Sequence, residues 1–348
     1  MSPIVIVGAG ASGLAVAASL RARGLRARLL DRHGVTGGAY REMPATMELV
    51  SPTALNALPG LAIDGAGEYM TAAGYAAYLG RYADHHGLAA ERAEVHRITR
   101  APRGARGHAG FEVHLASGDT ISARAVVVAS GMWDYPVSAP LPLGPPLAVM
   151  HSRAWRGAAA HPQRALLVVG GGMSGVETAV ELARAGRRVW LSSRRSVELI
   201  PRAVLGVDLH HIFRPLERFP VWLATRHCTR PRTFQADRGF SELVRAGRIA
   251  LRGPVIGSVG HTVHFAHGSP ASVELVVLAT GFTYATPFLP AEVARMPSGQ
   301  PRARRCQSVS WPGLFIVGMR CVGGIDSEFL RGIARDARHV AQTLVERA

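Results

Sequence analysis

The sequence predicts an α/β protein with parallel sheets and more than one domain, and three observations support this fold class. A glycine-rich stretch with GxGxxG spacing occurs at residues 8–13 and again at residues 170–175. Each stretch follows a short apolar, β-branched run and precedes a run with helical spacing, which is the order of elements in a βαβ unit. The third observation is the length of 348 residues, because single hydrophobic cores usually stop growing below that size.

The first unit begins near the N-terminus. Residues 3–7 predict a buried parallel strand, residues 11–24 predict a helix, and residues 26–34 predict a second strand. The tip of that second strand carries Asp31, followed by Arg32. A carboxylate at this place accepts a hydrogen bond from a ribose hydroxyl, so the unit predicts a dinucleotide site of the Rossmann type.

Each residue of the first glycine-rich loop has its own physical role. Gly8 permits the tight turn, Gly10 lets the backbone approach a pyrophosphate, and Gly13 lets the helix pack closely on the strand. The first helical turn contains Ala11 and Ser12, and its unpaired N–H groups are available to an anion.

The second unit repeats this arrangement. Gly170, Gly172 and Gly175 have the same spacing, and Met173 and Ser174 lie in the first turn of the helix that follows. The chain therefore contains two loops that can each bind a pyrophosphate, which implies two dinucleotides.

The second unit differs from the first at the tip of its second strand. Ser193 stands eighteen residues past Gly175, where the first unit has Asp31, and it is followed by Arg194 and Arg195. A carboxylate would repel a 2′-phosphate, whereas a serine and two guanidinium groups would bind it. The sequence thus predicts NADP(H) in the second site, and FAD is the natural partner in the first.

The charge of the chain argues against nucleic acid as a partner. The formal net charge is +16, and all 40 basic side chains are arginines. They are scattered along the chain, whereas a nucleic-acid-binding protein concentrates them in a stripe or tail. We expect the charge to attract anionic small molecules instead.

Cysteine spacing and hydropathy indicate the kind of compartment in which the protein works. Cys228, Cys306 and Cys321 lie far apart and form no CxxC pair, so we expect no metal site, no redox disulfide and a reducing compartment. No apolar run has the length of a membrane span, so we expect a cytoplasmic protein without integral membrane association.

Five further stretches carry a family resemblance. They are GGAY at residues 37–40, a helical stretch at 69–88, the proline-containing stretches at 126–140 and 278–290, and PGLFIVG at 312–318. Their order over nearly the whole chain resembles the flavin-containing monooxygenases, including small bacterial members and the plant indole-pyruvate monooxygenases.

The resemblance implies further cofactor contacts and a domain arrangement. The implied contacts are Gly38, Tyr40, Val95, Gly131, Gly281 and Gly318. It also implies an NADP(H)-binding domain, residues 156–274, inserted in an FAD-binding domain made of residues 1–155 and 275–348. The implied activity is NADPH-dependent oxygenation of a small organic substrate by O2 through a C4a-hydroperoxyflavin.

The sequence departs from the family pattern at places that bear on oxygenation. Pro145 and Leu147 replace the first half of the family's FxGxxxHxxxW motif, of which MHSRAW remains. Val50 and Ser51 stand where the family often has an asparagine over the flavin, and Asn56 is six residues away. An FAD- and NADP(H)-dependent dehydrogenase or oxidase without oxygen insertion therefore remains the alternative. A disulfide reductase would need a cysteine near residue 40, and the first cysteine is Cys228.

Two features of the sequence each allow more than one interpretation. His151 is either a hinge between domains that responds to NADP(H) or a histidine with a structural role. Residues 205–235, with Phe213, Phe219 and Trp222, either line a substrate, membrane or partner surface or pack on their own domain. No acid–base constellation is evident, so no catalytic residue is assigned, and the oligomeric state, a homodimer among the options, stays open.

Overall fold

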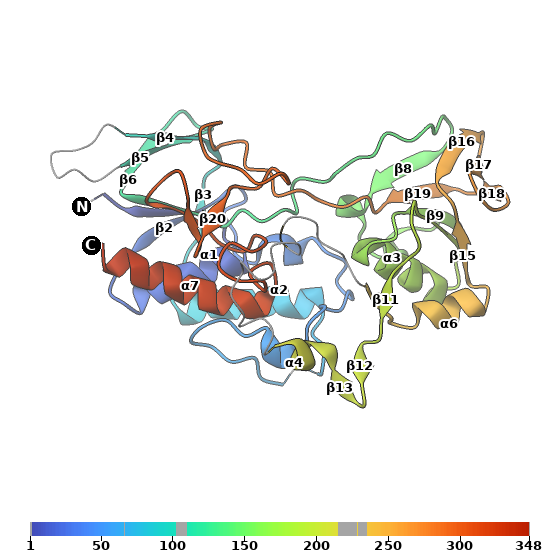
Figure 1. The fold of residues 1–348 in the computed structure, drawn as a ribbon, viewed down its shortest axis with the longest axis horizontal. Coiled ribbons are helices and arrows are strands. Elements are labelled where there is room, and N and C mark those ends of the chain that lie inside the picture. The colour runs from blue at the N-terminus through green and yellow to red at the C-terminus, as the bar shows by residue number, and fades with distance from the viewer. Residues whose placement is uncertain (1, 66, 102–109, 215–227, 229–234, 348) are drawn as a thin grey trace.

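The computed structural model describes residues 2–65, 67–101, 110–214, 228 and 235–347. They form two lobes that lie side by side (Figure 1), each built on a largely parallel sheet. Phe219 and Trp222, named above as candidate surface residues, lie outside the described part of the chain.

The first lobe is built on a seven-stranded sheet. Its strand order is β20 (Ala303–Arg304), β21 (Gln307–Ser308), β22 (Leu314–Ile316), β7 (Ala125–Val128), β1 (Ile4–Val7), β2 (Ala27–Asp31) and β3 (Glu91–Arg92). The strands from β22 to β3 pair in parallel, and the edge strands β20 and β21 are antiparallel. Fully buried β-branched side chains in β1 and β7 explain why these segments form the centre of the sheet.

Three helices and a small sheet complete this lobe. Helix α1 (Ala11–Arg21) packs against α7 (Leu330–Val345), which comes from the far end of the sequence, and α2 (Ala72–His85) lies beside α1 (Figure 1). The antiparallel strands β4 (Val95–Arg100), β5 (Phe111–Leu115) and β6 (Thr120–Ala123) form the small sheet. Short 3-10 helices, η1 (Gly38–Arg41) and η2 (Thr53–Leu55), lie between β2 and α2.

The second lobe is built on a five-stranded parallel sheet. Its order is β15 (Ile249–Arg252), β10 (Arg188–Ser192), β9 (Ala165–Val169), β19 (Leu275–Leu278) and β8 (Ala148–His151). One face packs on α3 (Met173–Arg184) and α6 (Phe240–Arg245), and the other face packs on a small sheet. That sheet consists of β16 (Val255–Val259), β17 (Thr262–Phe265) and β18 (Ala271–Ser272). The 3-10 helices η3 (Ser152–Ala154) and η4 (Ala158–Ala160) precede β9.

The second sheet extends beyond the limits expected for the inserted domain. Strand β8 precedes residue 156 and β19 follows residue 274, yet both pair within this sheet. Because paired strands share one core, we propose that the inserted domain is bounded near residues 148 and 278 instead of 156 and 274.

A stretch of the inserted domain crosses toward the first lobe. It contains β11 (Leu199–Ile200), β12 (Ala203–Val204), β13 (Val207–Asp208), the short helix α4 (Leu209–Phe213) and β14 (Gln235–Ala236). Figure 1 shows it leaving the second lobe at β11 and reaching the first lobe at α4. Among the helices described, none combines the length and apolar character needed to cross a membrane.

Candidate functional site

Both glycine-rich loops require glycine for the same geometric reason. Gly8 has φ +106, and a Cβ there would lie 2.6 Å from the Ala129 carbonyl oxygen. Gly170 has φ +126, and its Cβ would lie 2.2 Å from the Ala279 carbonyl oxygen. In each lobe the loop therefore runs directly against the strand end that leads out of the domain, and no side chain fits there.

The third glycine of each loop packs the helix on the loop. A Cβ on Gly13 would lie 1.9 Å from the Gly8 carbonyl oxygen, and one on Gly175 would lie 1.8 Å from that of Gly170. These distances are far below contact, so both helices approach their loops as closely as the backbone permits. Gly13 was predicted to permit such close packing, and Gly175 occupies the corresponding place in the second unit.

The helix N-termini at the two loops leave donors for a ligand. Helix α1 follows Gly10 and α3 follows Gly172, and neither N-cap residue has a side-chain hydrogen bond to the first turn. A Cβ on Gly172 would meet no atom within 4 Å. Uncapped N–H groups beside open space form an anion site, and a pyrophosphate fits both places.

A single cavity of about 2920 Å³ connects the two loops. Ligand sites for drug-sized molecules usually measure about 300–1000 Å³, so this cavity has room for two dinucleotides. All the predicted site residues except Gly13 and Gly175 line it: Gly8, Gly10, Ala11, Ser12, Asp31, Arg32, Gly38, Tyr40, Val95, Gly131, Gly170, Gly172, Met173, Ser174, Ser193, Arg194, Arg195, Gly281 and Gly318.

The first site keeps its carboxylate in a fixed position. The Asp31 carboxylate accepts hydrogen bonds from the backbone N–H groups of Ala9 (3.1 Å) and His33 (2.9 Å). The Arg32 guanidinium lies 3.5 Å from the Asp134 carboxylate, and both residues line the cavity. The end of β22 closes on the same loop, because a Cβ on Gly318 would lie 2.2 Å from Ser12 Oγ.

The second site presents cationic groups at the corresponding strand tip. Arg194 and Arg195 are exposed, and within the described part of the chain neither has an ion-pair partner. The Ser193 hydroxyl donates to the Arg195 carbonyl and holds the turn together. The two guanidinium groups suit a 2′-phosphate through charge-assisted hydrogen bonds.

Buried polar atoms between the two loops fit a ligand as well. Ser130 Oγ, Trp133 Nε1 and Ser152 Oγ are buried without a hydrogen-bond partner in the described structure, and all three residues line the cavity. Buried polar groups in proteins are nearly always paired, so a bound polar molecule is the natural partner. The residues present therefore fit the two dinucleotides predicted from the sequence.

The side of the cavity near the end of β22 contains a paired arginine. The Arg320 guanidinium donates to both Glu328 carboxylate oxygens at 2.7–3.0 Å, and the Tyr284 hydroxyl donates to Glu328 at 3.4 Å. All three residues line the cavity. Sequence reasoning missed them because no local motif marks them, and only the fold brings residues 284, 320 and 328 together.

Asn56, the asparagine nearest to the position where the family often has one, does not line the cavity. Asn56 is fully buried, its Nδ2 donates to the Ser51 carbonyl at 3.0 Å, and it is not among the residues that line the cavity. Val50 and Ser51 line the cavity in its place. The departure from the family pattern seen in the sequence is therefore also a departure in the site.

His151 lies at the junction of the two lobes. It ends β8, and its ring packs edge-on against Phe282, which follows β19. Its Nδ1 accepts a hydrogen bond from the Arg153 N–H at 3.0 Å, and burial lowers the pKa of His151. The position suits a hinge, and the hydrogen bond suits a structural role, so both interpretations stay predictions.

The cysteine spacing predicted no redox disulfide, yet the structure contains a disulfide. Cys228 and Cys321 form a disulfide although 93 residues separate them. Neither cysteine lines the cavity, and Cys306 is a buried free thiol. Spacing alone could not reveal this pair, because the fold brings together two distant segments with no local motif.

Two dinucleotide loops on separate parallel sheets, facing one cavity, define a flavoprotein oxidoreductase that uses FAD and NADP(H). The chain belongs to the pyridine nucleotide-disulphide oxidoreductase family, whose model matches residues 5–203.

Similar proteins extend this assignment. Indole-3-pyruvate monooxygenase YUCCA1 of rice is 28% identical over 98% of this chain and 90% of its own length. An uncharacterized CzcO-like oxidoreductase of Geobacillus kaustophilus is 24% identical over 98% of both chains.

Solved structures show the same fold. A flavin-containing monooxygenase from Stenotrophomonas maltophilia has a TM-score of 0.80 at 22% identity and covers 100% of this chain and 99% of its own. A bacillithiol disulfide reductase from Bacillus cereus has a TM-score of 0.75 at 20% identity, with the same coverage. These similarities confirm the predicted fold class and the resemblance given by the sequence.

Proposed function

We propose that the protein is an NADPH-dependent flavoprotein monooxygenase that oxygenates a small organic molecule with O2. The observation that carries the proposal is the shared cavity, which is lined by an acid-tipped loop in one lobe and an arginine-tipped loop in the other. The relatives named as monooxygenases, such as the rice protein, support the oxygenation step.

The chain contributes binding, orientation and exclusion of water. The uncapped N-termini of α1 and α3 bind the two pyrophosphates, and Asp31 orients a ribose through its hydroxyls. Arg194 and Arg195 select the 2′-phosphate. FAD bound in the first site would supply the capacity to take a hydride from NADPH and to activate O2, so the oxidising chemistry would belong to the cofactor. No side chain of a general acid or base is required for that step.

A second candidate is an FAD- and NADP(H)-dependent dehydrogenase or oxidase that inserts no oxygen. Val50 and Ser51 at the cavity, with Asn56 buried away from it, favour this candidate. Both functions share the cofactors and the hydride transfer, and they differ only in the fate of the reduced flavin.

We place the enzyme in the cytoplasm because both candidate reactions need a supply of NADPH. This compartment also keeps thiols reduced, which bears on the Cys228–Cys321 pair described below.

Rapid mixing distinguishes the candidates. The purified yellow protein is reduced anaerobically with NADPH and then mixed with oxygen while flavin absorbance is recorded. A distinct absorbing phase before the oxidised flavin returns supports the monooxygenase, whereas direct return supports the dehydrogenase or oxidase. If NADPH does not bleach the flavin at all, both proposals are wrong.

A further inference from the structure

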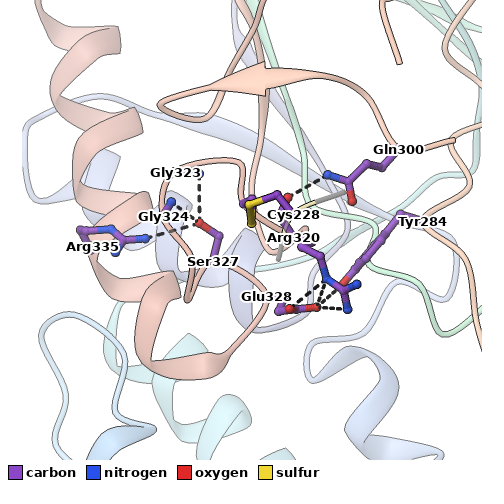
Figure 2. The surroundings of a disulfide bond; sticks show 10 residues. Cys228, Tyr284, Gln300, Arg320, Gly323, Gly324, Ser327, Glu328 and Arg335 are labelled. Carbon is purple, nitrogen blue, oxygen red and sulfur yellow. Dashed lines mark hydrogen bonds and ion pairs between the residues drawn. A yellow bond between two sulfur atoms is a disulfide. The ribbon is translucent and has the colours of Figure 1, made fainter. Parts of the chain in front are cut away.

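The Cys228–Cys321 disulfide links the two lobes covalently. Its α-carbons are 5.9 Å apart. Cys228 belongs to the inserted domain, in the sequence between α4 and β14, and Cys321 belongs to the loop between β22 and α7 of the first domain. The bond therefore joins a cysteine from the sequence of the inserted domain to a loop of the first domain, and Figure 2 shows its surroundings.

The loop that carries Cys321 also forms part of the cavity wall. Gly318 and Arg320 precede Cys321 and line the cavity. Gln300 Nε2 donates to the Arg320 carbonyl at 2.8 Å, and the Arg320 side chain pairs with Glu328 (Figure 2). Cys321 itself has φ +55, a conformation that residues other than glycine seldom adopt. These bonds fix Arg320, the residue next to Cys321, at the cavity wall.

The inserted domain has a second, noncovalent attachment to the first lobe. Arg238 donates to the backbone carbonyls of Glu48 (3.1 Å) and Leu49 (2.9 Å), and the Tyr69 hydroxyl bonds to Asp208. The ion pairs Arg202–Glu48 and Arg153–Glu42 connect the same parts of the chain. Within the described structure the disulfide therefore adds a covalent link to several noncovalent contacts, and opening it leaves an attachment that can break and re-form.

The two bridged cysteines are more accessible than the third. Cys228 and Cys321 are both partly exposed, whereas Cys306 has 0% exposure and burial raises the pKa of its thiol. Thiol exchange requires access to the sulfur and a thiolate, so a small thiol or peroxide can react with the exposed pair and not with Cys306.

We propose that Cys228 and Cys321 are a redox-modification site that controls movement of the inserted domain and thereby the release of NADP+. The proposal rests on the proposed cytoplasmic use of NADPH, because disulfides in reducing compartments are usually transient and redox-sensing. Lobe motions that open a nucleotide site often limit turnover, so a covalent link between the lobes slows exchange of the nucleotide.

The chemistry of the site balances with reagents of two classes. A peroxide closes the bridge: two thiols lose two protons and two electrons, the O–O bond breaks, and for hydrogen peroxide two water molecules form. Two equivalents of a small thiol reopen it by exchange, through a mixed disulfide, and leave as a small-molecule disulfide. In the absence of substrate, a reduced flavin passes its electrons to O2, and this reaction supplies hydrogen peroxide.

The first test measures the state of the bridge in the FAD-bound protein. Glutathione buffers of cytosolic composition should open it, seen as two additional thiols that react with a maleimide, while hydrogen peroxide should close it again. A bridge that stays closed in every such buffer, or a thiol count that never rises, would overturn the proposal.

The second test measures the NADP+ dissociation rate from the oxidised protein, the reduced protein, and the Cys228→Ser and Cys321→Ser variants. We expect dissociation about fivefold or more faster in all three open forms. Cys306→Ser is the matched control and should keep the redox response of the native chain. Equal rates in the open and closed forms would make the disulfide a static link and refute the regulation.

These readouts separate the two proposals. NADP+ dissociation and thiol counts need no turnover, so they remain informative even if the reduced flavin proves not to oxygenate a substrate. If the redox state changes NADP+ release but no substrate is oxygenated, the proposed redox control holds and the proposed monooxygenase activity is wrong.

Discussion

Asp31 and Ser193 are the residues that differentiate the two nucleotide sites. They occupy the same place in two units that are otherwise alike, one at the end of β2 and one just after β10. A carboxylate at this place binds a free ribose hydroxyl. In the second site the carboxylate is missing and Arg194 and Arg195 follow, so a 2′-phosphate can bind there. A single residue position thus assigns one dinucleotide to each lobe.

Replacing both Arg194 and Arg195 with alanine should reduce the preference for NADPH over NADH. We expect the ratio of kcat/KM values to fall about 10- to 100-fold, because two charge-assisted hydrogen bonds to the 2′-phosphate are lost. NADH values should change little. Steady-state NADPH and NADH oxidation by the FAD-bound protein measures the ratio.

Arg188→Ala is the matched control for that pair. Arg188 lies at the start of β10, where its guanidinium stacks on Trp190, and it does not line the cavity. The control removes one positive charge from β10, the strand that precedes Arg194 and Arg195. If this control lowers the preference as much as the double variant, a general charge effect explains the selectivity and our assignment is wrong.

Helix α2 holds residues 56–61 in place through its tyrosine side chains. Its tyrosines form a column of rings, and their hydroxyls bond to the backbone of residues 56–61. Tyr78 is central: its hydroxyl accepts from the Leu58 N–H at 2.8 Å and donates to the Leu61 carbonyl at 2.8 Å. The column thus fixes this segment against the helix.

Tyr78→Phe should destabilise the first lobe by about 1–3 kcal/mol, because it leaves the buried Leu58 N–H without an acceptor. Tyr82→Phe is the graded comparison, since it removes only one donor to the Pro59 carbonyl. We expect about 1 kcal/mol for that change. Urea denaturation monitored by tryptophan fluorescence gives both values, and an equal loss would contradict the special role of Leu58.

Helix α3 carries a carboxyl with an unusual pKa. Burial raises the pKa of Glu177 from its ordinary 4.5 to about 7; nearby Glu48 raises it further and Arg238 opposes the shift. Between these pH values the folded chain holds a proton that the unfolded chain has lost. The contribution of Glu177 to stability therefore falls as pH rises from 4.5 to 7 and is constant above that range.

Glu177→Gln should make the free energy of unfolding less dependent on pH between 4.5 and 7. Relative to the native chain, the variant should gain about 1–3 kcal/mol of unfolding free energy on going from pH 4.5 to pH 7. Chemical denaturation across this range measures it, with the exposed Glu198→Gln as the control. Parallel pH profiles for the native chain and Glu177→Gln would show that the carboxyl titrates alike in both states.

The whole molecule shows which features a sequence can reveal. The nucleotide loops were predictable because each function depends on glycines at fixed local spacing, and Gly8 and Gly170 show the geometry that enforces it. The limits of the inserted domain were harder to predict from the sequence, because strand pairing and not amino-acid composition places β8 and β19 in the second lobe. The Cys228–Cys321 bond depends on tertiary contact alone.

Arg238 couples the lobes through three groups. Its guanidinium pairs with Glu177 of its own domain at 3.3 Å and donates to the carbonyls of Glu48 and Leu49 in the other. The Arg238 side chain is only 13% exposed, so its guanidinium is poorly hydrated. Removing the guanidinium leaves a carboxyl and two carbonyls without their donor.

Arg238→Ala should therefore weaken the docking of the two lobes by about 1.5–3 kcal/mol, because the hydrogen bonds that cross between the lobes come from a charged donor. Calorimetry of the FAD-bound, disulfide-reduced protein should then resolve two unfolding transitions where the native chain gives one, because each lobe has its own hydrophobic core. Arg245→Ala, a change at an exposed arginine of α6, should leave the single transition intact. A single transition in Arg238→Ala would mean that the remaining contacts, such as that between Tyr69 and Asp208, suffice to couple the lobes.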